Sequence, residues 1–100
     1  MLSPMEHRWG KRALVDVPVR LRCRAGRVAG GRIVNISRSG ALIRTHLALA
    51  RLAYVDIHIN GVAAASFVTR VESGGIGVEW CEASLEIFTH VLRTTANRLT

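Results

Sequence analysis

Several residue types are scarce in this 100-residue chain, which has two cysteines, two prolines and five aromatic residues. The two cysteines have no CxxC spacing, so neither a disulfide framework nor a thiolate metal site is indicated. No apolar run approaches the roughly 20 residues of a membrane-spanning helix, and the start of the chain lacks the hydrophobic stretch of a signal peptide. These absences predict a cytoplasmic protein without membrane insertion, with Cys23 and Cys81 as small core side chains.

Catalytic patterns are missing as well. The seven acidic residues are scattered, and no Ser-His-acid arrangement, paired carboxylates or phosphate-binding P-loop is present. The four histidines, His7, His46, His58 and His90, have no metal-ligand spacing. We therefore expect no enzyme, no metal site and no cofactor.

Positive charge, by contrast, is abundant and concentrated in one half of the chain. Residues 1–44 carry ten cations against Glu6 and Asp16, a balance of +8, whereas the remainder is −1. This concentration predicts a phosphate-bearing or otherwise anionic partner. Thirteen of the fourteen basic residues are arginine, which suits bidentate recognition, although arginine codon preference in a GC-rich genome explains the ratio equally well.

Apolar residues alternate with polar ones over six short segments, the pattern of half-buried strands. The pair Asn60-Gly61 predicts a tight hairpin, and Gly30-Gly31 predicts a bulge or sharp bend. Six short strands at this spacing predict a mainly β fold, a small antiparallel barrel. The expected strands are Leu14–Arg24, Arg27–Ile36, Ala41–Thr45, Tyr54–Ile59, Val62–Val71 and Ile76–Trp80.

Near the end of the chain the apolar residues recur at the intervals of a helix, which predicts a helix that packs on the barrel. Ser84 is its expected N-cap. The segment 46–53 is ambiguous between a helical turn and a loop over the barrel mouth. We expect one domain, with a flexible arginine segment over 1–13, the barrel over 14–81 and the helix over 83–99. The helical-interval residues are Leu85, Phe88, Leu92, Ala96 and Leu99, with Ile87 and Val91 flanking them.

Two short patterns stand out from this background. The first is Arg8-Trp9-Gly10-Lys11-Arg12, and the second is Asn35-Ile36-Ser37-Arg38-Ser39-Gly40, with 22 residues between Arg12 and Asn35. Each is weak alone, since the second also fits an ordinary Asx or Ser turn. Strand parity places Val34 and Ile36 on one face, so we expect Asn35 and Ser37 on the outer wall of the barrel.

Together these patterns resemble the PilZ domain family of bacterial cyclic di-GMP receptors, over nearly the whole chain. The RxxxR motif of the family corresponds to Arg8 and Arg12, and its (D/N)xSxxG motif to Asn35, Ser37 and Gly40. Its late Gly-apolar-Gly-apolar strand corresponds to 75–80. The resemblance implies a six-stranded barrel of the split-barrel type with a C-terminal helix, which agrees with the strand count above.

The resemblance also implies the ligand, cyclic di-GMP, and the residues that bind it. Its phosphates and the paired O6 and N7 acceptors of its guanines suit the forked guanidinium groups of Arg8 and Arg12. Asn35 would bond a guanine edge, Ser37 would offer a hydroxyl, and Gly40 would allow close approach of the backbone and the ligand or supply a positive φ. Secondary candidates are Trp9, Lys11, Arg38 and Trp80, although the parity of Trp80 favours a core position.

The resemblance implies a receptor that changes conformation on ligand binding and signals to an unidentified partner protein, in motility, biofilm or exopolysaccharide control. His7 stands where many family members have a further arginine, which leaves the number of bound ligand molecules open. The alternatives are a basic barrel that binds RNA or single-stranded DNA and a ligand-independent adaptor of the same family. Few aromatics remain for base stacking, so we expect no nucleic-acid partner.

Overall fold

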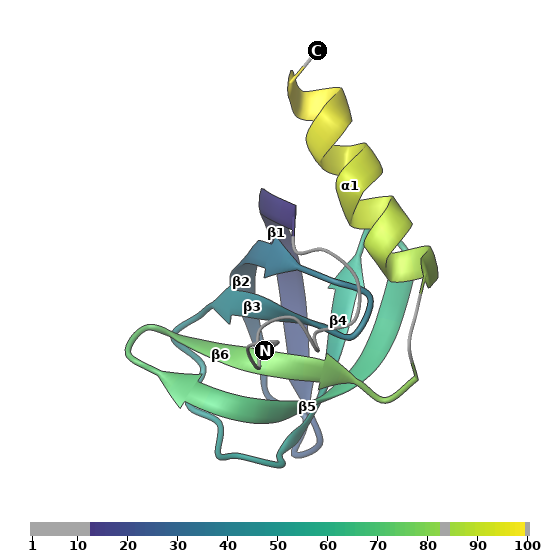
Figure 1. Ribbon diagram of the computed structural model, residues 1–100. Coiled ribbons are helices and arrows are strands. Elements are labelled where there is room, and N and C mark those ends of the chain that lie inside the picture. The colour runs from purple at the N-terminus through teal and green to yellow at the C-terminus, as the bar shows by residue number, and fades with distance from the viewer. Residues whose placement is uncertain (1–12, 83–84, 100) are drawn as a thin grey trace, which may run out of the picture.

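The computed structural model describes residues 13–82 and 85–99, which form six strands and one helix (Figure 1). All neighbouring strands are antiparallel, and the sheet closes into a barrel in the order β1-β2-β3-β6-β5-β4. The predicted six-stranded antiparallel barrel with a C-terminal helix is therefore confirmed. The elements are β1 Ala13–Cys23, β2 Val28–Ile36, β3 Gly40–Arg44, β4 Tyr54–Ile59, β5 Val62–Glu72, β6 Gly75–Trp80 and α1 Leu85–Leu99.

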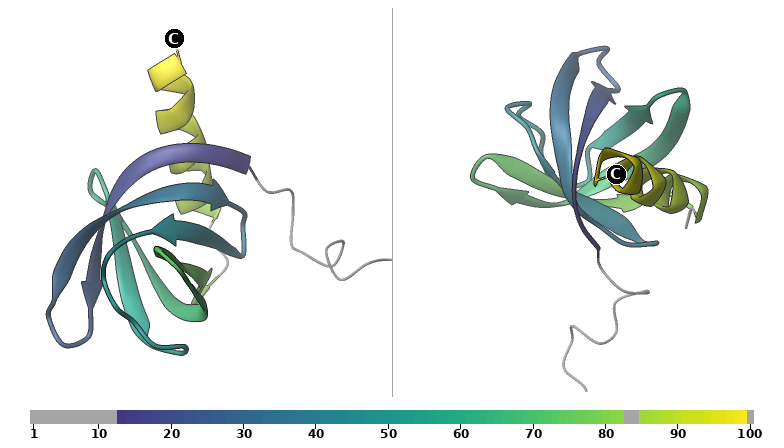
Figure 2. Two further views of the ribbon diagram at one scale, coloured as in Figure 1. Left: turned by 90° about the vertical axis from the view of Figure 1, so that its left-hand side faces the viewer. Right: turned by 90° about the horizontal axis from the view of Figure 1, so that it is seen from above.

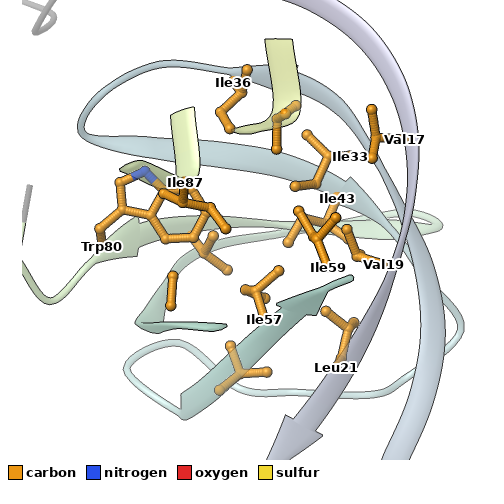
Figure 3. Close-up of a cluster of buried hydrophobic side chains, with 14 of the residues drawn as sticks. Val17, Val19, Leu21, Ile33, Ile36, Ile43, Ile57, Ile59, Trp80 and Ile87 are labelled. Carbon is orange, nitrogen blue, oxygen red and sulfur yellow. The ribbon is translucent and has the colours of Figure 1, made fainter. Parts of the chain in front are cut away.

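Branched aliphatic side chains from every strand fill the interior of the barrel (Figure 3). On β1, Val17, Val19 and Leu21 point inward, whereas Arg20 and Arg22 are exposed. This alternation follows from the period of two in a strand, and β-branched residues suit a packed barrel interior. The largest fully buried side chains in the described residues include Leu21, Ile33, Ile36, Ile43, Ile57, Ile76 and Ile87.

The hairpin between β4 and β5 has the predicted tight turn. Asn60 and Gly61 have φ angles of 44° and 87°, and Ile59 faces Val62 across the two strands. Two successive positive φ values are the requirement of a two-residue type I′ turn, which Asn-Gly meets at low cost. The sequence signal and the conformation therefore agree at this position.

Gly30 and Gly31 do not form a bulge, which was one of the two predicted alternatives. They face Arg20 and Val19 in an unbroken β1–β2 register, and the shift in that ladder lies between Leu14 and Val17. Gly31 is instead at a close approach, because a Cβ there would lie 2.9 Å from the carbonyl oxygen of Arg44.

The helix α1 packs against β1 and β5 and then extends beyond the strands (Figures 1 and 2). Ile87 and Val91 are fully buried, whereas Phe88 and Leu92 are half-buried at the edge of the contact. The face that meets the barrel is thus centred on two residues that the sequence pattern placed at its margin. The predicted N-cap, Ser84, lies outside the described residues. Among the described residues, no helix is long and apolar enough to cross a membrane.

Two further expectations about apolar residues have different outcomes. Cys23 is buried, as predicted, but Cys81 is exposed, so its assignment to the core was wrong. Cys81 follows the inward-facing Trp80, and alternation turns it outward.

The ambiguous segment 46–53 is an irregular loop whose half-buried Leu47 and Leu49 pack against the core.

The position of the helix face leads to a test by substitution. Ile87→Ala should lower the free energy of unfolding by about 2–5 kcal/mol, because it removes a fully buried branched side chain and leaves a cavity. The exposed Thr89 is the matched control on the same helix, and Thr89→Ala should change stability by no more than about 0.5 kcal/mol. Urea denaturation of both variants gives the comparison, and equal losses would contradict the assigned face.

Candidate functional site

The turn that joins β2 to β3 is built from the side chains of its own motif. Ser37 Oγ accepts hydrogen bonds from the backbone N–H groups of Ser39 and Gly40, each at 3.3 Å, and lies 3.0 Å from Ser39 Oγ. The Ser37 N–H donates to the Gly40 carbonyl at 2.8 Å. The predicted Ser turn is therefore present, and its hydroxyl is already engaged within the turn.

Trp80 connects this turn to β6 by two hydrogen bonds. Its indole Nε1–H donates to the Ser37 carbonyl at 3.2 Å, and its backbone N–H donates to the Ser39 carbonyl at 2.8 Å. The side chain is only 4% exposed and belongs to the same buried cluster as Ile87 (Figure 3). Trp80 thus has the core position that strand parity favoured, and it supports the turn through its polar edge.

Gly40 lies where β3 closely approaches β6. It faces Glu79 across the ladder, and a Cβ at this position would overlap the carbonyl oxygen of Val78. Its φ is not in the positive range, so close backbone approach explains this glycine and conformational freedom does not. Of the two reasons expected for Gly40, a positive φ is absent, and the close approach found is to β6.

A cavity of about 330 Å³ lies beside this turn, on the outer face of β2, β3, β6 and β5. One row of directly paired residues crosses it, from Asn35 to Leu42, then Gly77, then Arg70. Gly77 leaves the middle of the row without a side chain and so forms a floor between two walls. The lining residues are Asn35, Ser37, Ser39, Gly40, Ala41, Leu42, Thr69, Arg70, Gly77, Val78 and Glu79.

Asn35 reaches this cavity for a reason other than the expected one. In the β2–β3 ladder Ile33 faces Ile43 and Asn35 faces Leu42, so Val34 is an extra residue on β2. Because of this bulge, Ile33 and Ile36 are both fully buried while Val34 is only half-buried, and the assumed shared face of Val34 and Ile36 was wrong. Asn35 still lies on the outer side, at the rim of the cavity.

Some of the predicted site residues are brought together and others are not. Asn35, Ser37 and Gly40 line the same cavity. Arg38 is exposed in the turn and is not among the lining residues. The remaining predicted residues, Arg8, Trp9, Lys11 and Arg12, lie outside the described residues.

Sequence reasoning missed the wall that β5 contributes to the cavity. Thr69 and Arg70 line it, and the Thr69 hydroxyl donates to the Gly77 carbonyl at 3.3 Å. The only available signal was the outward glycine of the late Gly-apolar-Gly-apolar strand, which leaves space for a neighbour. Which strand lies next to that glycine depends on the barrel order, which the sequence pattern does not specify.

The charges of the described lining residues of the cavity balance. Arg70 is its one cation and Glu79 its one carboxylate among the described residues. Arg70 Nε forms an ion pair with Glu72 Oε2 at 2.6 Å. The exposed Arg20, Arg22, Arg32 and Arg44 lie on β1, β2 and β3 and are not among the lining residues.

Among the described residues two titratable groups have shifted pKa values, and both lie away from the cavity. A hydrogen bond to Asp16, at 2.5 Å, raises the pKa of Arg32. Burial raises the pKa of the Cys23 thiol, but hydrogen bonds at Ala25 and Arg27 outweigh it, and the net shift is downward. Over 13–82 and 85–99, no three His, Cys, Asp or Glu residues are grouped so that they would hold a metal ion.

Fold and site together define a small antiparallel β-barrel that carries a polar cavity on its outer face, next to an Asn-Ser-Gly turn. The family model described as "PilZ domain" matches residues 6–96, and the chain therefore belongs to the PilZ domain family. The matched range includes both the arginine motif and the turn.

A solved structure supports the fold. The crystal structure of the PilZ domain of CeSA from a cellulose-synthesizing bacterium superposes with a TM-score of 0.65 at 18% sequence identity. The match covers 91% of this chain and 100% of the other. A comparison with curated protein sequences gives no match.

The two outward-facing glycines of the site differ in a way that stability measurements should detect. Gly40→Ala should lower the free energy of unfolding by about 1–3 kcal/mol or more, because its Cβ would overlap the backbone of β6. Gly77→Ala is the control, since its Cβ would lie 3.4 Å from Arg70 Cβ, an ordinary contact distance. Alanine in a strand should leave the melting temperature unchanged or raise it slightly. A similar loss in both variants would show that close approach is not what distinguishes Gly40.

Proposed function

We propose that this protein is a cytoplasmic receptor that binds cyclic di-GMP and passes the signal to a partner protein through a change in conformation. One observation carries the proposal. Asn35, Ser37 and Gly40 have different structural roles, and all three line one cavity on the outer face of the barrel. Membership of the PilZ domain family supports the same ligand. Binding alone would be the signal, and no bond is made or broken.

Each motif residue has a separate part in this proposal. Asn35 is half-buried at the rim, and its amide offers both a donor and an acceptor to a guanine edge. Ser37 is buried, and its hydroxyl is engaged with Ser39 and Gly40, so its main contribution is to shape the turn. Gly40 allows β6 to close the end of the cavity.

The start of β1 supports a role for the arginine motif at the same site. Leu14 faces Asn35 and Ala13 faces Ile36 in the β1–β2 ladder. The chain therefore enters the barrel beside the turn. Ala13 lies there, and Arg12 directly precedes it in the sequence. In the proposal, Arg8 and Arg12 bind the guanines and phosphates of the ligand from above the cavity.

The arginines outside the cavity favour a second candidate function, the binding of an anionic polymer such as RNA. Arg32 and Arg44 face each other directly across β2 and β3, and both are exposed. Like charges in such a pair are unfavourable unless an anion lies nearby, and Asp16, which pairs with Arg32, supplies one carboxylate for the two guanidinium groups. A ligand-independent adaptor of the same family is the remaining alternative.

Calorimetric titration distinguishes these candidates. We expect cyclic di-GMP to bind, whereas GMP, which has one guanine and one phosphate, should bind much more weakly, and a short RNA should not compete. Tighter binding of the RNA than of cyclic di-GMP would favour the polymer. Absence of any heat with cyclic di-GMP at high micromolar concentration would reject the receptor.

The arginine motif gives the next expected outcome. Arg12→Ala should abolish detectable binding of cyclic di-GMP, because a bidentate contact to a guanine contributes about 1–3 kcal/mol and a phosphate contact adds to it. The melting temperature of the ligand-free protein should hardly change. Arg51→Ala, at an exposed position of the 46–53 loop, is the matched control and should bind normally. A collapse of stability in Arg12→Ala would instead indicate a structural role.

A further inference from the structure

The wall of the cavity opposite Asn35 is formed by Arg70 on β5. It is the last member of the row Asn35, Leu42, Gly77, Arg70, in which each residue is the direct partner of the next. A Cβ built on Gly77 would lie 3.4 Å from Arg70 Cβ and 3.7 Å from Arg70 Nε. The Arg70 side chain therefore runs beside the side-chain-free floor as far as Nε and contributes to the lining of the cavity.

An irregularity in β5 directs Arg70 to this face. Val68 is fully buried and faces Val78, so strict alternation would turn residue 70 inward as well. The register shifts between Val68 and Arg70, and Arg70 pairs with Gly77 on the outer side. The hydroxyl of the extra residue, Thr69, bonds the Gly77 carbonyl and holds this arrangement. Bulges often re-aim a side chain next to a functional site.

The guanidinium of Arg70 forms an ion pair with Glu72 on the same strand. Arg70 Nε and Glu72 Oε2 are 2.6 Å apart, and the two side chains remain 51% and 40% exposed. An exposed ion pair of this kind is weak, so an anionic ligand would displace the carboxylate at little cost. A guanidinium engaged at Nε also keeps its two terminal nitrogens, which carry four further N–H donors.

We propose that Arg70 is a ligand-binding residue of this cavity and that Glu72 is a positioning residue that competes with the ligand for it and so sets the affinity. The inference rests on the proposed function and extends it to a residue pair outside both motifs. In the free protein Glu72 holds the guanidinium beside the floor; on binding, a phosphate or a guanine O6–N7 edge replaces the Glu72 carboxylate.

Calorimetric titration with cyclic di-GMP tests the pair. Glu72→Gln should tighten binding by about two- to fivefold, because it removes a weak competing ion pair. Arg70→Ala should weaken binding by about tenfold or more, the loss of one bidentate contact. Arg70→Lys keeps the charge without the fork and should restore only part of the affinity. In the double variant, Glu72→Gln should add nothing to the effect of Arg70→Ala, since Glu72 acts through Arg70.

The matched control is Glu82→Gln, which removes one exposed carboxylate that does not line the cavity and should leave the dissociation constant unchanged. Melting temperatures of all variants without ligand separate binding from stability. If Glu72→Gln and Glu82→Gln change the affinity equally, or if Arg70→Ala binds as the unchanged protein does, the inference is wrong while the proposed function stands. If the unchanged protein does not bind cyclic di-GMP, the proposed function itself fails.

Discussion

The attachment of the Ser37–Gly40 turn to β6 is the constraint on which the rest of the site depends. Trp80 donates two hydrogen bonds to carbonyls of the turn, one from its indole and one from its backbone. Gly40 lets β6 approach so closely that a methyl group would overlap the Val78 carbonyl. The turn is therefore held both from the core and from its neighbouring strand. A loop fixed in this way gives a ligand one rigid wall without an ordering cost at the moment of binding.

Two breaks in strand alternation then decide which side chains face the cavity. Val34 is the extra residue on β2, and Thr69 is the extra residue on β5. Each break precedes a polar side chain of the same cross-strand row, Asn35 on one side and Arg70 on the other. Regular strands would bury one of these polar groups or turn an apolar group outward. The bulges thus let a barrel with an apolar interior carry a polar row on its surface.

The parts of this arrangement differ in how far the sequence predicts them. Strand positions and the Asn60-Gly61 hairpin follow from short-range patterns, so both were predictable. The proximity of Asn35, Ser37 and Gly40 was predictable because they lie close together in the sequence, but the route by which Asn35 faces outward, the bulge at Val34, was not. Arg70 was not, since its place depends on a bulge and on β5 lying next to β6. The outward position of Cys81 was predictable but missed, because alternation after the inward-facing Trp80 already turns residue 81 outward.

Charge distribution links the fixed cavity to the segment that precedes it. The described lining holds one cation and one carboxylate, whereas cyclic di-GMP carries two phosphates. Under the proposed function, the missing positive charge comes from Arg8, Lys11 and Arg12, which the sequence places just before Ala13. Ala13 lies opposite Ile36, next to the turn. Both phosphates of the ligand would then have positively charged partners only when the ligand joins the arginine segment to the barrel wall. A partner protein that recognises the joined surface would respond to the ligand although the barrel itself does not change.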